Sequence, residues 1–149
     1  MDAVFSHTTA LEIIRRWDSF RLVTRLVEPD LSQPLATGAS ALRDLLEPGG
    51  LLAGTTLPCH LLARSNHERT HGPLVTAHLA RASYPSGSFF SPAPGVLCSS
   101  PELVAVQMCE YATELELLLL VDELCGYYAI QPGARSGLVR RREPLTSVE

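Results

Sequence analysis

Two pairs of residues in the middle of the chain are of the types that bind metal ions. His67 and His71 are four residues apart, and Cys59 is followed directly by His60. Structural zinc sites usually draw their ligands from pairs such as CxxC, and zinc proteases from HExxH, and neither pattern occurs in this sequence. We therefore expect His67 and His71 to be exposed in a polar turn, with no metal bound. A metal-dependent enzyme that uses His60, His67 and His71 is the alternative hypothesis.

Other residues with catalytic potential lack the spacing that catalysis needs. Ser99 and Ser100 do not lie in a G-x-S-x-G elbow. Asp122 and Glu123 are adjacent, so on a helix they point about 100° apart and cannot form a facing acid–base pair. The glycines of residues 49–54 are not followed by GK[ST], and the sequence contains no lysine for a nuclease-like Asp–Glu–Lys set. We expect no catalytic residue, no cofactor and no enzymatic activity.

The charged residues are distributed unevenly along the chain. The formal net charge is −4, and no lysine or arginine lies between Arg81 and Arg135. Binding of nucleic acid depends on basic residues that neutralise phosphates, so we expect no nucleic acid partner for this region. An acidic helix face would suit a basic protein partner, with Glu116 and Glu123 as the partner-facing residues. A solvated face without a partner is the interpretation that the sequence favours.

A helix start is predicted directly after a short strand at residues 96–98. Ser100 precedes Pro101, and this order is typical of a helix N-terminus, because serine caps the helix and proline is tolerated at its first position. A capping box formed by Ser99 and Glu102 is the alternative. The two interpretations differ by one residue, and the sequence does not decide between them.

A second, longer helix is predicted from Thr113 to Tyr128. At 100° per residue, its apolar residues gather in one sector, while Glu116 and Glu123 lie on the opposite side. We expect this helix to contribute the largest share of the core. Its predicted buried face comprises Leu117, Leu118, Val121, Leu124, Cys125 and Tyr128.

The N-terminal part of the chain begins with another predicted helix, from Phe5 to Trp17. Ser6 is placed to cap this helix, and His7 beside the cap is interpreted as a histidine bonded to local backbone. Arg21 to Val27 alternates loosely and is either a short strand or a helix. Thr37 to Leu46 is predicted to be a short helix ended by Pro48-Gly49-Gly50. The predicted buried face of the first helix comprises Ala10, Ile13, Ile14 and Trp17.

Four short apolar segments are predicted to be strands. They predict a small, mainly antiparallel sheet of about four strands that packs against the N-terminal and C-terminal helices. The predicted fold class is therefore α+β. The segments are Leu57–Ala63, Leu74–Leu79, Ser88–Phe90 and Val96–Cys98.

The length of 149 residues predicts one domain, which we place at residues 1–134. Residues 135–149 are polar and interrupted by glycine, so they are interpreted as an exit segment. LTSVE at the end resembles a helix start, and the segment is therefore expected to be the beginning of a missing C-terminal domain.

No signal peptide and no apolar run of about 20 residues is present, so we expect no membrane association. The widely spaced Cys59, Cys98, Cys109 and Cys125 are interpreted as reduced core thiols of a cytoplasmic protein.

Three short motifs together resemble a known family. They are SHTTALEII from Ser6, VLCSSPELVAVQM from Val96 and DELCGYYAI from Asp122. Their order and spacing are similar to those of the antitoxin module of the AbiEi type, from abortive-infection (type IV) toxin–antitoxin systems, and of related actinobacterial proteins. The motif residues are Ser6, His7, Thr9, Ala10, Leu11, Ser100, Pro101, Glu102, Glu123, Leu124, Cys125 and Gly126.

This resemblance implies a non-enzymatic module that binds a nucleotidyltransferase-like toxin in phage defence. It implies structural roles for the motif residues, with Ser6 and Ser100 as caps, Leu124 and Cys125 in the core, and Gly126 at a close backbone approach. The family's N-terminal winged helix has no counterpart before Ser6, which argues against promoter binding. Some relatives carry a restriction-endonuclease-like domain of the Vsr type, so an accessory region of a truncated DNA-processing protein is the alternative function.

Overall fold

Five strands form a mixed β-sheet at the centre of the molecule. The computed structural model describes residues 2–16, 27–30, 32–131, 134–141 and 144–146. The strands are β1 (Ala3–Phe5), β2 (Cys59–Ala63), β3 (Val75–Leu79), β4 (Phe89–Ala93) and β5 (Val96–Ser99). Their order across the sheet is β3-β2-β1-β5-β4. The β1–β2 and β4–β5 pairs are antiparallel, whereas the β1–β5 and β2–β3 pairs are parallel.

The α+β fold class is confirmed, but the sheet is larger and more mixed than predicted. It has five strands rather than about four, and it is not mainly antiparallel. The central strand β1 is not predicted from the sequence, because three residues are too few to show a period. Val4 and Phe5 are both 0% exposed, although they point to opposite faces. A strand covered on both faces is a plain apolar run without alternation.

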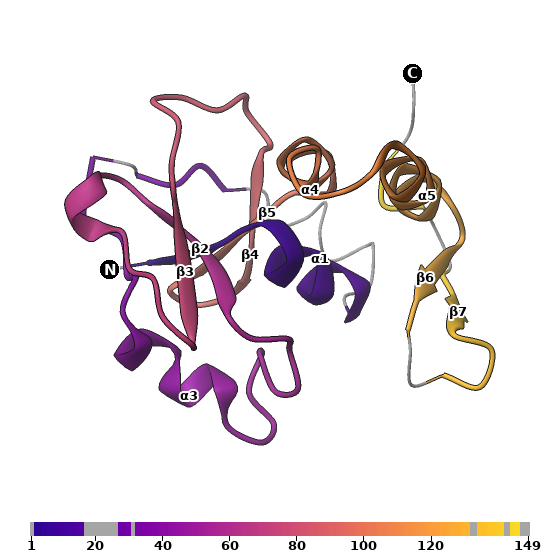
Figure 1. The fold of residues 1–149 in the computed structure, drawn as a ribbon, viewed down its shortest axis with the longest axis horizontal. Coiled ribbons are helices and arrows are strands. Elements are labelled where there is room, and N and C mark those ends of the chain that lie inside the picture. Colours follow the sequence, from indigo (N-terminus) through magenta and orange to yellow (C-terminus); the bar gives the residue numbers. More distant parts are fainter. Residues whose placement is uncertain (1, 17–26, 31, 132–133, 142–143, 147–149) are drawn as a thin grey trace.

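Helices α1 (His7–Arg16) and α4 (Pro101–Met108) pack beside the sheet, and a further helix lies beyond them (Figure 1). The predicted buried residues Ala10, Ile13 and Ile14 of α1 share one core cluster with Phe5 and other sheet residues, and this is confirmed. Trp17, the last residue of the predicted face, lies outside the described residues.

Ser100 is the cap of α4. Its hydroxyl accepts a hydrogen bond from the amide of Leu103 at 3.4 Å, and Pro101 is the first helical residue. The capping-box alternative is wrong, because the Ser99 hydroxyl instead donates to the Phe5 carbonyl in the neighbouring strand at 3.2 Å. The cap therefore orients α4, while Ser99 links β5 to β1.

Helix α5 (Glu114–Cys125) begins where the sequence predicts. Thr113 caps it and forms a capping box with Glu116. The helix ends at Cys125 rather than Tyr128. A Cβ on Gly126 would lie 2.8 Å from the Asp122 carbonyl oxygen of the same helix and 2.9 Å from the Tyr128 ring, so a side chain has no room at this position.

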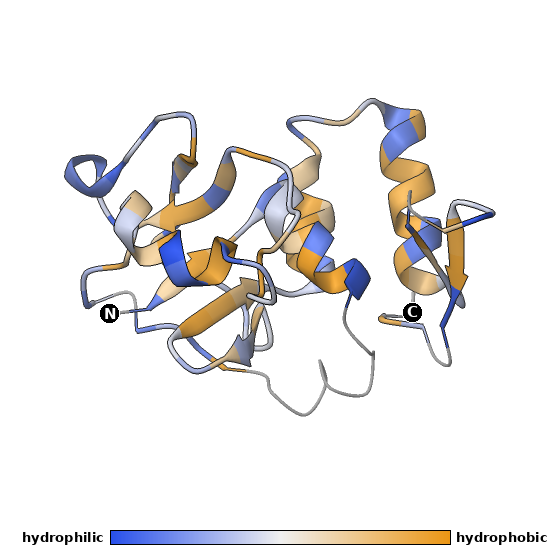
Figure 2. Ribbon diagram, turned by 90° about the horizontal axis from the view of Figure 1, so that it is seen from below, coloured by the Kyte–Doolittle hydropathy of each residue, from blue (hydrophilic) through white to orange (hydrophobic). Residues whose placement is uncertain are grey.

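The buried face of α5 is rotated relative to the prediction. Leu120, Glu123 and Leu124 are buried, whereas Leu118, predicted inside, is 67% exposed. The run from Leu117 to Val121 is apolar on every side of the helix, so its pattern alone does not fix the rotation. Figure 2 shows mainly hydrophobic residues along the middle of this helix.

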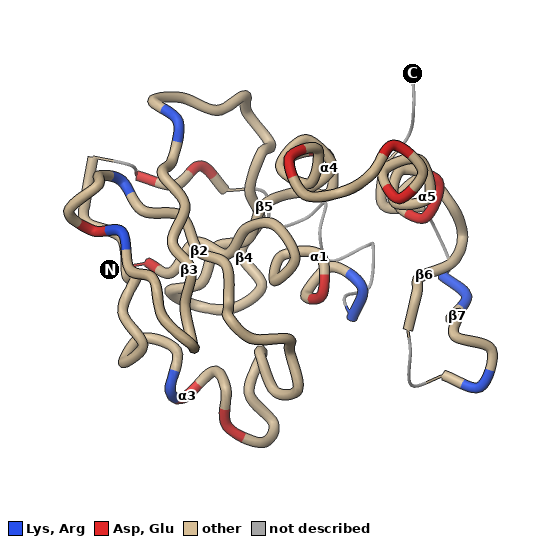
Figure 3. Tube along the Cα trace, in the orientation of Figure 1, with Lys and Arg blue, Asp and Glu red and all other residues tan. Residues whose placement is uncertain are grey.

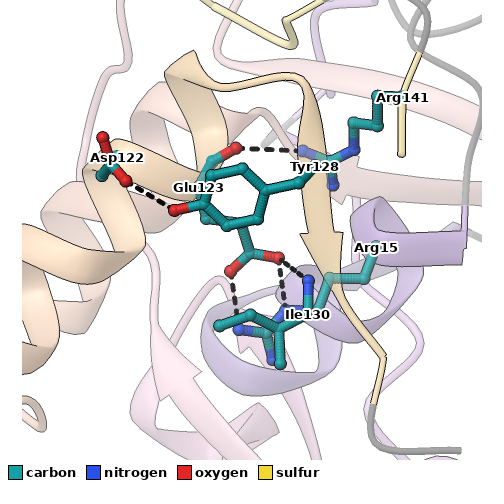
Figure 4. Close-up of polar contacts among 6 residues, drawn as sticks. All are labelled: Arg15, Asp122, Glu123, Tyr128, Ile130 and Arg141. Atoms are coloured by element: carbon teal, nitrogen blue, oxygen red, sulfur yellow. Dashed lines mark hydrogen bonds and ion pairs between the residues drawn. The ribbon is translucent and has the colours of Figure 1, made fainter. Parts of the chain in front are cut away.

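Glu123 is the residue that fixes α5 against α1. Its carboxylate accepts two hydrogen bonds from Arg15, at 2.9 and 2.8 Å, and a third from the Ile130 amide at 2.8 Å (Figure 4). Arg141 donates to its backbone carbonyl at 3.2 Å. The side chain is 0% exposed, so the expectation that Glu123 faces solvent or a partner is wrong. A buried carboxylate is tolerated when it is paired in this way.

A hairpin of β6 (Tyr128–Ile130) and β7 (Leu138–Arg140) follows α5. Part of the predicted exit segment is therefore folded, because β7 lies within residues 135–149. Leu145 is buried as well, and its amide donates to the Leu124 carbonyl at 3.0 Å. The last three residues, 147–149, on which the predicted helix start depends, lie outside the described residues.

The remaining elements are short. The predicted helix at Thr37–Leu46 is a 3-10 turn, η1 (Ala39–Leu42), followed by α3 (Arg43–Leu46). Residues 21–26 of the ambiguous segment Arg21–Val27 are outside the described part of the chain. A second 3-10 turn, η2, covers Asn66–Glu68. Within the described residues, no helix has the length and apolar character needed to cross a membrane.

The four cysteines are free thiols, as expected, but they are not all in the core. Cys59 and Cys98 are buried, and Cys125 is half-buried. Cys109 is exposed, so its predicted place in the core is wrong. It lies directly after α4, where its thiol donates to the Ala105 carbonyl one turn earlier.

Candidate functional site

Three histidines that are far apart in the sequence meet beside the sheet. His7 is the first residue of α1, His60 lies in β2 and His78 lies in β3. Each offers one ring nitrogen, and these three atoms lie within 4.8 Å of one another. We call these three residues the histidine cluster. Neither their spacing nor any motif predicts this arrangement.

The register of two parallel strands brings two of the histidines to the same face. His60 is opposite Thr76, and Leu62 is opposite His78. Alternate residues of a strand point to the same side of the sheet. His60 and His78 are therefore diagonal neighbours on one face of the β2–β3 pair.

The start of α1 is bonded to β2, and this places His7 over the strand pair. The Ser6 amide donates to the His60 carbonyl at 3.0 Å, and the His60 amide donates to the Thr9 hydroxyl at 2.8 Å. The His7 amide donates to the Gln107 side chain at 3.1 Å. His7 has φ of +50°, a left-handed conformation that is uncommon without glycine. The SHTT motif thus positions a side chain in addition to starting a helix.

The imidazole rings are in direct contact. Nδ1 of His60 lies 2.8 Å from Nε2 of His78, and the rings of His7 and His78 stack with centroids 3.9 Å apart. Tyr111 meets the rings edge-on, and its hydroxyl lies 3.4 Å from Nδ1 of His78. Two imidazole nitrogens at 2.8 Å require one donor and one acceptor. The His60–His78 pair therefore cannot carry a proton on both facing nitrogens.

Burial and mutual repulsion keep the cluster neutral. Burial, followed by the charges of His78 and His60, lowers the pKa of His7 from 6.5 to about 3. Burial, followed by the charge of His60, lowers the pKa of His78 to about 4. Burial also lowers the pKa of His60. At neutral pH all three rings present unprotonated nitrogens, the form that binds protons and metals.

The lowered pKa of His7 predicts a pH-dependent stability. A histidine with a lower pKa in the folded chain takes up a proton on unfolding, so folding is favoured most above pH 6.5 and less as the pH falls toward the folded pKa. For His7 alone we expect the unfolding free energy to fall by about 1.4 kcal/mol between about pH 7.5 and about pH 5.5. Urea denaturation across this range measures the fall.

The matched variants for this measurement are His7→Asn and His67→Asn. Asparagine tolerates the left-handed backbone and does not titrate, so His7→Asn should show a flatter pH profile than the parent. His67 is exposed and outside the cluster, so His67→Asn should keep the parent's profile. A His7→Asn profile as steep as the parent's would contradict a buried, neutral His7.

The cluster borders a polar cavity. His7 and His78 line a volume of about 320 Å³ together with Arg69, Glu110 and Tyr111. The Nε of Arg69 donates a hydrogen bond to the Ala77 carbonyl at 3.3 Å, so part of the guanidinium is bonded to the backbone. Both a cationic and an anionic side chain therefore lie beside the histidines, together with space for a small polar ligand.

The structure separates the histidines that the sequence groups together. His67 and His71 are exposed near η2, as predicted. His60 belongs instead with His7 and His78, so the proposed set of His60, His67 and His71 is not assembled. All three cluster residues lie in predicted elements, because LPCHLLA and LVTAHL predict the strands of His60 and His78, and the SH pair opens a helix. Nothing in the sequence indicates that they meet.

A second surface feature lies on α5. Leu115, Leu118 and Leu119 are 65%, 67% and 51% exposed. Leu119 also lines a groove of about 270 Å³ between α5 and α1, to which Leu11, Arg15 and Tyr111 contribute. We call Leu115, Leu118 and Leu119 the apolar ridge.

Comparison with models of protein families, with curated proteins and with solved structures finds no match for this chain.

Proposed function

We propose that this chain is an antitoxin-like protein-interaction module that binds a nucleotidyltransferase-like toxin through the apolar ridge of α5. The observation that carries the proposal is the exposure of three leucines on one well-formed helix. The motif order SHTTALEII, VLCSSPELVAVQM and DELCGYYAI supports the choice of partner.

The spacing of the ridge suits insertion into a groove. Leu115, Leu118 and Leu119 stand at i, i+3 and i+4, the pattern by which an amphipathic helix docks on a partner. The capping box at Thr113 stabilises the first turn of this helix. Burial of each leucine in a complex would contribute about 1–2 kcal/mol before the cost of association.

The charges around the ridge define the chemistry of the partner. Glu114, Glu116 and Asp122 are exposed on the same helix. Figure 3 shows acidic residues and no basic residue along α4 and α5. The partner is therefore a protein with an apolar groove that is rimmed by lysine or arginine. Of the two predicted partner-facing acidic residues, Glu116 remains on this surface and Glu123 does not.

The replacement Leu118→Asp is expected to weaken this complex by about 30-fold or more, because central apolar anchors contribute about 2 kcal/mol or more when removed. The measurement is the affinity of the purified chain for the toxin encoded beside its gene. Rescue of growth when both proteins are expressed provides a second readout.

Leu138→Asp is the control, because Leu138 on β7 is a similarly exposed leucine away from α5. Both variants should melt like the parent, since neither leucine is in the core. Equal effects of the two variants, or no binding of the toxin by the parent chain, would contradict the proposal. A homodimer that Leu118→Asp disrupts, without toxin binding, would assign the ridge to self-association instead.

A further inference from the structure

We propose that the histidine cluster is a binding site for Zn²⁺ or a similar divalent transition-metal ion, with Nε2 of His7, Nδ1 of His60 and Nε2 of His78 as ligands. Imidazole nitrogen is a preferred ligand of these ions. The inference goes beyond the proposed protein interaction and does not depend on it, because the cluster and the apolar ridge consist of different residues.

Hydrogen bonds at the far side of two rings leave the ligand nitrogens available. The Ser6 hydroxyl lies 2.9 Å from Nδ1 of His7, and the Tyr111 hydroxyl lies 3.4 Å from Nδ1 of His78. Metal-binding histidines usually have their second ring nitrogen bonded in this manner, which fixes the tautomer and the ring orientation. Both Nε2 atoms are thereby left for a metal, and Nδ1 of His60 already faces one of them at 2.8 Å.

The distances require only small side-chain movements. With zinc–nitrogen bonds of about 2.0–2.1 Å and tetrahedral angles, ligand nitrogens lie about 3.3 Å apart. The close pair of His60 and His78 has to open by about 0.5 Å from the observed 2.8 Å. The remaining separations are at most 4.8 Å, so they have to close by at most about 1.5 Å. His60 and His78 are only half-buried and have room to adjust, while the hydrogen bonds around His7 hold its backbone in place.

Three histidines leave a fourth coordination position. The cavity of about 320 Å³ beside His7 and His78 is the space from which a water or a small anion would reach it. Glu110 and Arg69 line the same cavity, so both a carboxylate and a cation are near that position. The titratable side chains that line this cavity beside the cluster are Arg69, Arg81, Tyr84, Glu110 and Tyr111, and the charge of His71 also acts on His78.

The test uses the full chain without an affinity tag, after treatment with a chelator, and titrates it with Zn²⁺ by calorimetry and with Co²⁺ by visible absorption. We expect one ion per chain and a cobalt spectrum typical of nitrogen ligands without thiolate bands. His7→Asn, His60→Asn and His78→Asn should each weaken binding by about 100-fold or more, because each removes one of three ligands. Tyr111→Phe should weaken it by about 10-fold, because it removes only the orienting hydroxyl.

His67→Asn is the matched control, since His67 is exposed and outside the cluster. Cys109→Ser controls for the exposed thiol. If His7→Asn does not fold, as judged by circular dichroism, the double replacement of His60 and His78 by asparagine replaces it. The proposal is overturned if the parent binds no zinc at millimolar concentration, if binding survives that double replacement, or if the two control replacements abolish it.

Discussion

Replacement of Glu123 by glutamine is expected to lower the unfolding free energy by about 3 kcal/mol, the largest effect of a single polar change that we expect in this chain. The carboxylate is 0% exposed and holds two hydrogen bonds from Arg15 and one from the Ile130 amide. Glutamine fills the same volume but removes the charge. It leaves Arg15 and the nearby buried Arg141 without their anion. Burial lowers the pKa of Arg141, and the Glu123 charge opposes that shift.

Urea denaturation of the variant measures this loss, with Glu114→Gln as the control. Glu114 is exposed in the first turn of the same helix, so its replacement should change stability by only about 0.5 kcal/mol. A combined Arg15→Met and Glu123→Met variant should lose less than the sum of the two single losses, because neither charge is then left without its partner. Equal stabilities of Glu123→Gln and Glu114→Gln would mean that the carboxylate is solvated and that α5 lies differently.

Leu124→Ala is expected to lower the unfolding free energy by about 3 kcal/mol, whereas Leu118→Ala should lower it by less than about 0.5 kcal/mol. The two leucines are on the same helix and undergo the same chemical change. Leu124 is 1% exposed in the main core, and Leu118 is 67% exposed. Removal of a buried side chain loses its transfer free energy and leaves a cavity.

Thermal and urea denaturation of both variants provides the comparison. The sequence predicts that both leucines are buried on one face of the second helix, and the structure places them in different environments. A loss at Leu118 as large as that at Leu124 would therefore support the rotation predicted from the sequence. It would also remove the exposed anchor on which the proposed toxin interaction depends.

Local signals are what the sequence predicts well in this fold. Ser100 with Pro101 sets the start of α4, because a helix cap depends only on its neighbours, whereas the predicted end of α5 at Tyr128 is three residues too late. The strands β2, β3 and β5 are also predicted close to their bounds, whereas β4 continues to Ala93, three residues beyond its predicted end. The parallel pairing of β2 and β3 is not, since only residues 64–74 connect them and a short connection favours an antiparallel hairpin.

The rotation of α5 and the histidine cluster depend on contacts between distant segments. From the sequence, Glu123 is expected to be exposed to solvent. Its burial is favourable only because its carboxylate pairs with Arg15. His7, His60 and His78 each lie in an element that the sequence predicts at least in part. None of those elements indicates which strands are neighbours or in which register they pair, so the cluster could not be predicted.

The central position of β1 has a consequence for how the chain reaches this fold. Ala3 pairs with Val96, and Phe5 pairs with Leu61, so both neighbours of the strand are made long after it during synthesis. Until β2 has been made β1 has no partner on either edge, and until β5 has been made one edge stays unpaired. Closure of so long a loop is entropically costly, and topologies with many distant contacts fold slowly. The sheet can therefore be completed only after β5 has emerged.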